Sequence, residues 1–364
     1  MEQHTHIWGK EGIFRVNFTL VRDFLFPDRE KKEVFMKKKT IFFAVAAVFL
    51  CTATTSFASG AWKVKHNNAI VLAMFGTTVE PALQGLLNIR TKMEKKFPDI
   101  PVRIAFTSNI IRRKWQHRAD DPAYSKAHPE IPVDVLHVKT PLATIADLQN
   151  DGYDTIVMQP THIAMGEEYL DLVTYVDSLM RMGTVKKAKY KPFHKVVLGR
   201  PALGTYGTDH PYAEDITAAA TALSPDADLA ASEGAALVYM GHGNEHFPSA
   251  GSYLELADRM RQLYPTVVTV IGNVEGFPAI EDVMDTLKFN GVKKVILKPC
   301  MVVAGDHAMN DMAGSEPDSW KPVLEKNGFE VIPIKRGLGE QDEFAEIFVN
   351  HAADAARDAG IVLK

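Results

Sequence analysis

Short apolar runs alternate with amphipathic, helix-like segments from residue 69 to the end of the chain. Apolar runs of this length, bounded by glycine and proline turns, are typical of buried strands. Strands that alternate with helices predict parallel sheets covered by helices on both faces. A final amphipathic segment, 342–360, predicts a C-terminal helix. The predicted strands are 69–77, 102–108, 155–162, 195–203, 235–243, 266–276, 293–302 and 329–339.

The two halves of this pattern resemble each other residue by residue. MQPTHIAMGEE (158–168) aligns without a gap on LKPCMVVAGDH (297–307), which sets Glu168 against His307. VLAMFGT likewise aligns on VYMGHGN and sets Phe75 against His242. We infer duplication of one α/β unit, with chance likeness between two parallel sheets as the alternative. The predicted fold class is α/β, with two similar doubly wound parallel-sheet domains.

The repeat also sets the predicted domain boundaries. An N-terminal α/β domain is expected at 66–204 and a C-terminal α/β domain at 235–340. Between them, 205–234 is expected to be a linker region because it lacks strand character. Residues 341–364 form the closing helical segment, and residues 1–58 are expected to hold an upstream segment and a signal peptide.

The N-terminal region has the pattern of an export signal. Residues 36–58 combine a basic MKKK start, an apolar core at 41–50 and small residues suited to cleavage. A buried helix of the fold is the alternative, and the run is too short to span a membrane. Leu50 before Cys51 is too large for a lipoprotein signal. A periplasmic protein without a membrane anchor is therefore expected.

Composition excludes several function classes. The 364 residues are 46% hydrophobic and 24% charged, which is ordinary for a soluble globular protein of about two domains. A net charge of −4 argues against nucleic-acid binding. The chain lacks phosphate-binding glycine loops and a G-x-S-x-G elbow, so neither ATP nor another nucleotide is expected. Removal of the signal would leave Cys300 alone, as a predicted core residue.

Three potential metal ligands follow successive strands of the second half. His242, Glu275 and His307 occur at near-equal spacing, each after a predicted strand. Open parallel sheets bind ligands outside the carboxyl ends of their strands, so these side chains are expected at one cleft edge. Two imidazoles and a carboxylate suit Co²⁺, Fe²⁺, Ni²⁺ or Zn²⁺. Each residue alone could be a turn or loop residue, but their joint placement favours a metal site.

The positions that correspond in the first half hold different chemistry. Phe75 and Glu168 stand where the second half has His242 and His307. One half would then hold the imidazoles, and the other an apolar wall and an acid. Near His307, Asp311 and its neighbour Asp306 could orient the imidazole from outside the ligand set.

Six segments together resemble a known family. They are MFGTT, AFTSNIIRRK, HIAMGEEY, MGHGNEH, VEGFP and MVVAGDHAMNDM, spread from about residue 66 to the C-terminus. They look like the sirohydrochlorin cobaltochelatases of anaerobic cobalamin synthesis, which are ATP-independent class II chelatases. The resemblance implies two similar α/β halves with a cleft between them. It also implies insertion of Co²⁺, and possible insertion of Fe²⁺, into sirohydrochlorin with loss of the pyrrole N–H protons.

The resemblance gives roles to individual residues. His242 and His307 match the family's metal-handling catalytic histidines, and Glu168 matches a cleft acid. Glu275 matches less closely and is expected as a third metal ligand. A neutral imidazole can hold the ion or accept a proton, and a carboxylate can move protons away. The expected partners are sirohydrochlorin and a divalent metal, within a homo-oligomer.

A polycarboxylate substrate such as sirohydrochlorin needs cations in its cleft. Arg112 and Arg113, with Lys114, follow the second predicted strand and are candidates, although a solvated helix face is the alternative. Phe75 and Trp115 could flank the macrocycle, although both residue types are more often core.

Two features depart from the cytosolic members of this family. One is the export signal, since cobalamin synthesis is cytosolic. The other is an apparent insertion at 116–138, which contains His117, His128 and His137. Surface histidines need no function. The alternative is that His128 or His117 is an extra metal or haem ligand at a subunit contact.

Two hypotheses of function follow. The first is an enzyme that inserts Co²⁺ into sirohydrochlorin, with a ferrochelatase acting on protoporphyrin as a variant. The second is a periplasmic metal or tetrapyrrole carrier without turnover, because two α/β lobes around a cleft also suit a binding protein. The motifs favour the enzyme.

Overall fold

The computed structural model describes residues 66–364, except for residue 186 and residues 245–249. The predicted signal at 36–58 lies outside the described residues. The predicted strands are confirmed, each overlapping its expected range. Their bounds are β1 Asn68–Met74, β2 Val102–Phe106, β3 Thr155–Pro160, β4 Lys195–Leu198, β5 Ala236–Gly243, β6 Thr269–Glu275, β7 Lys294–Pro299 and β8 Glu330–Pro333.

The strands form two parallel sheets with the same topology. The first has the order β2-β1-β3-β4 and the second has the order β6-β5-β7-β8. Every pairing is parallel, as in Ile70 opposite Val102 and Leu237 opposite Thr269. Central strands such as β1 and β5 are apolar along most of their length because both faces of each sheet are covered. The predicted doubly wound α/β class is therefore confirmed.

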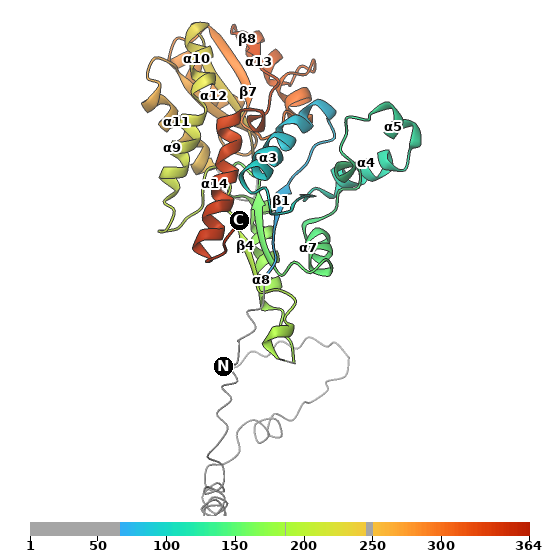
Figure 1. The fold of residues 1–364 in the computed structure, drawn as a ribbon. Coiled ribbons are helices and arrows are strands. Elements are labelled where there is room, and N and C mark those ends of the chain that lie inside the picture. The colour runs from blue at the N-terminus through green and yellow to red at the C-terminus, as the bar shows by residue number, and fades with distance from the viewer. Residues whose placement is uncertain (1–65, 186, 245–249) are drawn as a thin grey trace, which may run out of the picture. The chain divides into compact units, whose positions relative to one another are not determined.

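Helices cover the sheets, and the segment expected as a linker, 205–234, contains two of them (Figure 1). No helix in the described part of the chain has the length and apolar character that a membrane span requires. The helices are α3 Leu83–Lys96, α4 Asn109–Ala119, α5 Pro122–Ala127, α6 Val133–Leu136, α7 Pro141–Asn150, α8 Glu167–Arg181, α9 Tyr212–Ala222, α10 Ser224–Ser232, α11 Ala250–Leu263, α12 Ile280–Phe289, α13 Trp320–Lys326 and α14 Asp342–Asp358. The shorter turns are η2 Glu80–Ala82, η3 Ala188–Tyr190, η4 Ala308–Met312 and η5 Leu338–Glu340.

The C-terminal helix α14 returns to the first half of the chain. It lies beside α3 and contacts β3 and α9 (Figure 1). Its apolar face, which includes Phe344 and Phe348, is fully buried. That face belongs to one continuous core that also contains Leu72 of the first sheet and Tyr239 of the second. The two sheets therefore share buried apolar surface.

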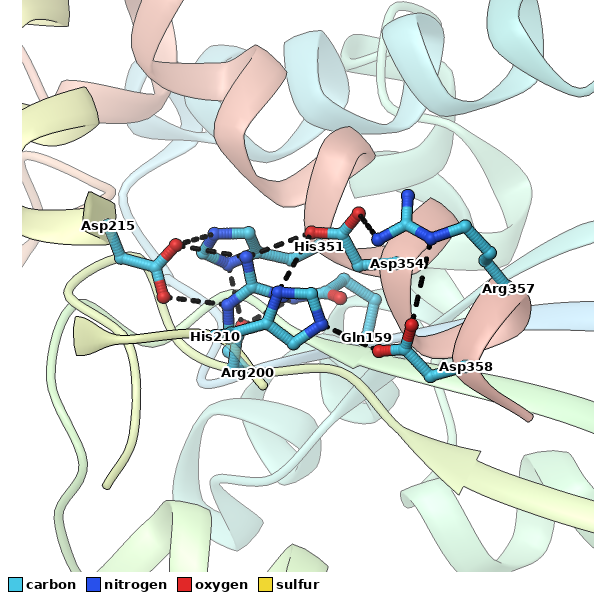
Figure 2. A network of polar contacts seen from close by, with 8 residues as sticks. All are labelled: Gln159, Arg200, His210, Asp215, His351, Asp354, Arg357 and Asp358. Atoms are coloured by element: carbon cyan, nitrogen blue, oxygen red, sulfur yellow. Dashed lines mark hydrogen bonds and ion pairs between the residues drawn. The ribbon is translucent and has the colours of Figure 1, made fainter. Parts of the chain in front are cut away.

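A buried polar network fixes α14 to the end of β4 (Figure 2). Arg200 donates to both carboxylate oxygens of Asp215, at 2.6 and 2.9 Å, and to Asp354 at 2.9 Å. His351 of α14 donates from Nδ1 to the Arg200 carbonyl oxygen, and its Nε2 lies 3.1 Å from Asp215 Oδ1. Burial opposes ionisation of Asp215, but hydrogen bonds from His351 and Arg200 outweigh it and lower the pKa of that carboxyl. The network joins β4, α9 and α14.

A close backbone contact joins α3 to the second half. A Cβ atom at Gly85 would lie 2.8 Å from the carbonyl oxygen of Val302, so the two segments approach closely only with glycine at this position. One turn further along α3, Asn88 donates to the carbonyl oxygen of Gly339 at 3.0 Å and to Asp342 at 3.1 Å. This contact helps to fix the distance between the two halves.

Replacement of Asp215 by asparagine should destabilise the fold. The change leaves Arg200 and His351 without their buried anionic partner, and removal of one member of a buried pair costs about 3 kcal/mol. Urea unfolding of D215N should show this loss. The control is Asp177→Asn, which removes an exposed pair with Arg181 and should cost less than about 1 kcal/mol. Equal stability of the two variants would contradict the role given to the network.

Candidate functional site

A cavity of about 610 Å³ lies where loops at the carboxyl ends of both sheets meet. Five of the predicted site residues line it, and they come from both halves of the chain. The first half contributes Phe75 and Glu168, and the second contributes His242, Glu275 and His307. A larger cavity of about 770 Å³ beside β6 includes none of them. The structure therefore brings the predicted metal ligands and the facing wall into one cleft.

The two predicted catalytic imidazoles lie edge to face in this cleft. The ring centroids of His242 and His307 are 4.9 Å apart, with an interplanar angle of 90°. Glu275 is on the same side, with its Oε2 atom 4.0 Å from His242 Nδ1. The side chains of His242 and Glu275 are each 43% exposed, so an ion can reach them from solvent. The two imidazoles and the carboxylate of Glu275 thus face the same part of the cleft.

Hydrogen bonds at Nδ1 determine which ring nitrogen of His242 and His307 is free to bind a metal ion. His307 Nδ1 lies 2.5 Å from Asp311 Oδ2, one turn further along η4. His242 Nδ1 lies 3.0 Å from the carbonyl oxygen of Gly243, to which it can only donate. A proton on Nδ1 leaves the lone pair on Nε2, and this is how protein partners prepare histidines for metal binding. Asp306 accepts a hydrogen bond from Asn310 at 2.9 Å.

Gly243 is needed for the turn that presents His242. Its φ angle is +75°, and a Cβ atom there would lie 1.9 Å from the carbonyl oxygen of Glu275. Both the backbone conformation and the space therefore require glycine. The glycine that follows His242 in the sequence lets β5 and β6 end side by side with both ligands at the edge.

The first half forms the opposite wall. Phe75 is 44% exposed and lines the cleft, so its ring is available to a flat ligand. Glu168 lies in the first turn of α8. Trp115 is fully buried, and its indole N–H donates to the carbonyl oxygen of Thr77 at 2.7 Å. Trp115 therefore supports the cleft wall from behind instead of flanking a bound ring.

The predicted substrate-binding arginines do not line the cavity, whereas Lys114 does. Helical spacing explains the difference, because Ile110, Ile111 and Lys114 share the face of α4 that is turned to the cleft. Arg112 and Arg113 lie on its other faces, and Arg112 donates to Asn109 of the same helix. The structure therefore places Lys114 in the cleft lining and Arg112 and Arg113 outside it.

The described lining of the cleft is rich in acids. Lys114 is its one lysine or arginine among the described residues. The carboxylates that line it are Glu167, Glu168, Asp171, Glu275 and Asp306. This differs from the expected cation-rich cleft. An acidic lining attracts divalent cations and supplies proton acceptors.

One cleft residue was missed by sequence analysis. His162 follows β3 and lines the cavity, and both of its ring nitrogens are buried without a hydrogen-bond partner among the described residues. Burial lowers the pKa of this imidazole from 6.5 to about 4, so it stays neutral near pH 7. The repeat sets Met301 against it, so the duplicated pattern gave no signal.

The histidines of the insertion lie outside the cleft lining. His117 is exposed on α4, and His137 is exposed at the end of α6. His128 ends α5 and lies 3.3 Å from carboxylate oxygens of both Glu80 and Glu130. His128 therefore lies near two carboxylates, whereas His117 and His137 are exposed on the surface.

A family model described as cobalt chelatase (CbiK) matches residues 68–357. The chain belongs to the cobalt chelatase family. The match covers both sheets and every predicted site residue, so the family inferred from the motifs is confirmed.

Two curated relatives of this cobalt chelatase family member are similar over most of their length. A sirohydrochlorin cobaltochelatase, CbiKC, of Nitratidesulfovibrio vulgaris is 32% identical over 286 residues, which is 79% of this chain and 89% of that protein. A sirohydrochlorin cobaltochelatase of Salmonella typhimurium is 30% identical over 289 residues, which is 79% of this chain and 96% of that protein.

The fold resembles that of a solved protein structure. SirB from Bacillus subtilis with Fe³⁺ superposes with a TM-score of 0.50 at 14% identity, covering 81% of this chain and 98% of that one. At this identity the likeness shows a shared two-lobed α/β fold.

The buried imidazole of His162 should make the fold sensitive to mild acid. Its folded pKa, about 4, lies below the unfolded value of 6.5, so the unfolded chain binds more protons between them. Unfolding free energy should therefore fall as pH drops from about 7 to about 5, with His162 accounting for about 2 kcal/mol.

Urea unfolding of H162Q at both pH values provides the test. The variant should lose about 2 kcal/mol of the wild-type pH dependence. His137→Gln, at an exposed position, is the matched control and should keep that dependence. The same pH dependence in H162Q and wild type would show that His162 does not titrate in this way.

Proposed function

We propose that this chain inserts Co²⁺ into sirohydrochlorin without ATP. The observation that carries the proposal is the edge-to-face pair of His242 and His307, 4.9 Å apart beside Glu275 in a cleft of about 610 Å³. The names of the two curated relatives support the same metal and the same substrate class. Fe²⁺ is proposed as a second metal, because the same ligand types bind both ions.

The second half would bind the ion. His242 and His307 present Nε2 lone pairs because their Nδ1 atoms face Gly243 O and Asp311 Oδ2. Glu275 adds a negative charge beside His242. Imidazole and carboxylate bind Co²⁺ well enough to capture it, and the ligand set is open enough for transfer to a better chelator. The macrocycle, with its inward-facing nitrogens, is that chelator.

The reaction also requires the removal of protons. As the ion enters, the pyrrole nitrogens keep their electron pairs for the metal, and each N–H proton passes to a base. Glu168, on the wall opposite the imidazoles, is the proposed first acceptor, and other carboxylates of the lining can relay the proton to solvent. Because Glu168 and the imidazoles are on opposite walls, proton removal by Glu168 and metal delivery would occur on opposite faces of the substrate.

The first half would position the macrocycle. The exposed ring of Phe75 offers a flat apolar contact, and Lys114 offers a cation to a peripheral carboxylate. Helix α4 also begins beside the cleft, with Ser108 in the lining, so its N-terminal N–H groups favour an anion there.

We further propose that the reaction occurs in the periplasm. The basic start, apolar core and small-residue segment of 36–58 support this location. Fractionation of cells that express the full chain should place the shortened protein in the periplasmic fraction. Recovery of the uncleaved chain from the cytosol would reject this location without affecting the proposed chemistry.

Loss of either imidazole should stop metal insertion. His242→Ala and His307→Ala should each lower kcat for Co²⁺ insertion, followed by sirohydrochlorin absorbance under anaerobic conditions, by about a hundredfold or more. Asp311→Asn should cost about tenfold, since Asp311 only orients His307. His137→Ala is the control and should behave as wild type. Wild-type rates in both histidine variants would refute the assignment, and tight binding without turnover by the wild type would indicate a carrier instead.

Affinity for the substrate should depend on the side chains on the face of α4 that lines the cleft. Lys114→Ala should raise the KM for sirohydrochlorin several-fold with little change in kcat, because Lys114 lines the cleft and acts on the periphery of the substrate. Arg113→Ala removes an equal charge from the neighbouring position outside the lining and should change KM little. Equal effects would mean that general attraction, and not a contact in the cleft, governs binding.

A further inference from the structure

We propose a second divalent-metal site, formed by Glu80, His128 and Glu130 outside the cleft. Each of these residues offers one ligand atom, and the three atoms lie within 4.8 Å of one another. None of the three lines the cavity that holds His242 and His307. The site does not depend on the chelatase reaction, and its ligand types suit Co²⁺, Zn²⁺ or a similar ion.

The spacing of the ligand atoms fits an ion better than it fits direct pairing. His128 Nδ1 lies 3.3 Å from Glu80 Oε2 and 3.3 Å from Glu130 Oε1. A charge-assisted hydrogen bond would be shorter, at about 2.7–2.9 Å. Ligand atoms about 2.1 Å from a tetrahedrally bound ion lie roughly 3.4 Å from each other, which is close to the observed separation.

The charges of the three side chains also favour a bound divalent ion. The Nδ1 atom of His128 holds at most one proton, so it can donate to only one of the two carboxylates around it. The other carboxylate then receives no hydrogen bond from this imidazole, and the two negative charges lie on either side of it. A dication neutralises both carboxylates at once, while a neutral imidazole supplies a lone pair without adding charge.

Neighbouring groups already orient two of the ligands. The hydroxyl of Tyr124 donates to Glu80 Oε1 at 2.6 Å, which leaves Oε2 directed at His128. The Tyr124 ring also stacks on the His128 ring, with centroids 4.3 Å apart. Such supporting contacts are typical of metal sites and preserve ligand geometry.

The backbone holds the same residues in place. His128 N–H donates to the Tyr124 carbonyl at the end of α5, and Ile131 N–H donates to the His128 carbonyl at 3.2 Å. Glu80 begins η2, shortly after the loop that contributes Thr78 to the cleft lining. Glu80 and His128 have side chains 31% exposed, and that of Glu130 is 64% exposed. The site is therefore open to solvent on the side of Glu130 and needs no rearrangement to admit an ion.

Co²⁺ titration of the full-length chain tests the proposal. His242→Ala/His307→Ala serves as the background, so that the cleft ligands do not contribute. Binding is followed by calorimetry and by the visible absorption of bound Co²⁺. In this background, His128→Ala should abolish one binding event, and Glu80→Gln should weaken it at least tenfold. Tyr124→Phe should weaken it about tenfold, because only the orientation of Glu80 is lost.

The matched control is His117→Ala, an exposed histidine of the same insertion that is outside the cluster. It should leave the stoichiometry and affinity unchanged. Circular dichroism checks that each variant is folded, and Glu80→Gln keeps the test valid if His128→Ala fails to fold. Unchanged Co²⁺ binding in the Glu80 and His128 variants would overturn the proposal. A loss of thermal stability without a change in binding would likewise overturn it and identify the cluster as an ion pair only.

Discussion

The parallel pairing of the strands determines where this protein can place reactive side chains. In each sheet every strand points the same way, so the loops that follow the strands gather at one edge. His242 and Glu275 are at the ends of β5 and β6, which pair with Gly243 opposite Glu275. His307 reaches the same edge from the loop after β7. The convergence of side chains from three separate β-α units is thus a direct result of strand direction.

The shared topology also explains how the two halves divide the work. Equivalent loops face each other across one cavity, so a substitution in either copy changes one wall and leaves the other intact. Phe75 and His242 occupy matching positions in the repeat, as do Glu168 and His307, and all of them line the cleft. The second half presents two imidazoles and a carboxylate to the cleft, while the first presents an apolar ring and an acid. This asymmetry gives the cleft two chemically different walls.

Sequence patterns were sufficient to predict the fold and to predict that the residues at the strand ends meet. Both predictions depend on features that are local in the chain. The strand runs are short and apolar, and the ends of parallel strands meet by necessity. Side-chain direction on a helix is a different matter, since it depends on which face of α4 packs inward. Lys114, and not Arg112 or Arg113, therefore lines the cleft. His162 was missed because its significance lies in burial. The sequence named His128 as an alternative metal or haem ligand, but its neighbour Glu80 comes from a distant part of the chain and only folding brings the two together.

The contact between Gly85 and the carbonyl oxygen of Val302 has a further consequence for the cleft. Val302 lines the cavity from the second half, and Gly85 belongs to α3, whose Leu86 lines it from the first half. Because the side chain of glycine is only a hydrogen atom, position 85 lets the two halves approach each other closely. A methyl group at position 85 would clash with the Val302 carbonyl oxygen and push the two halves apart, without contact to any catalytic group. The width of the cleft can therefore change independently of the side chains that line it.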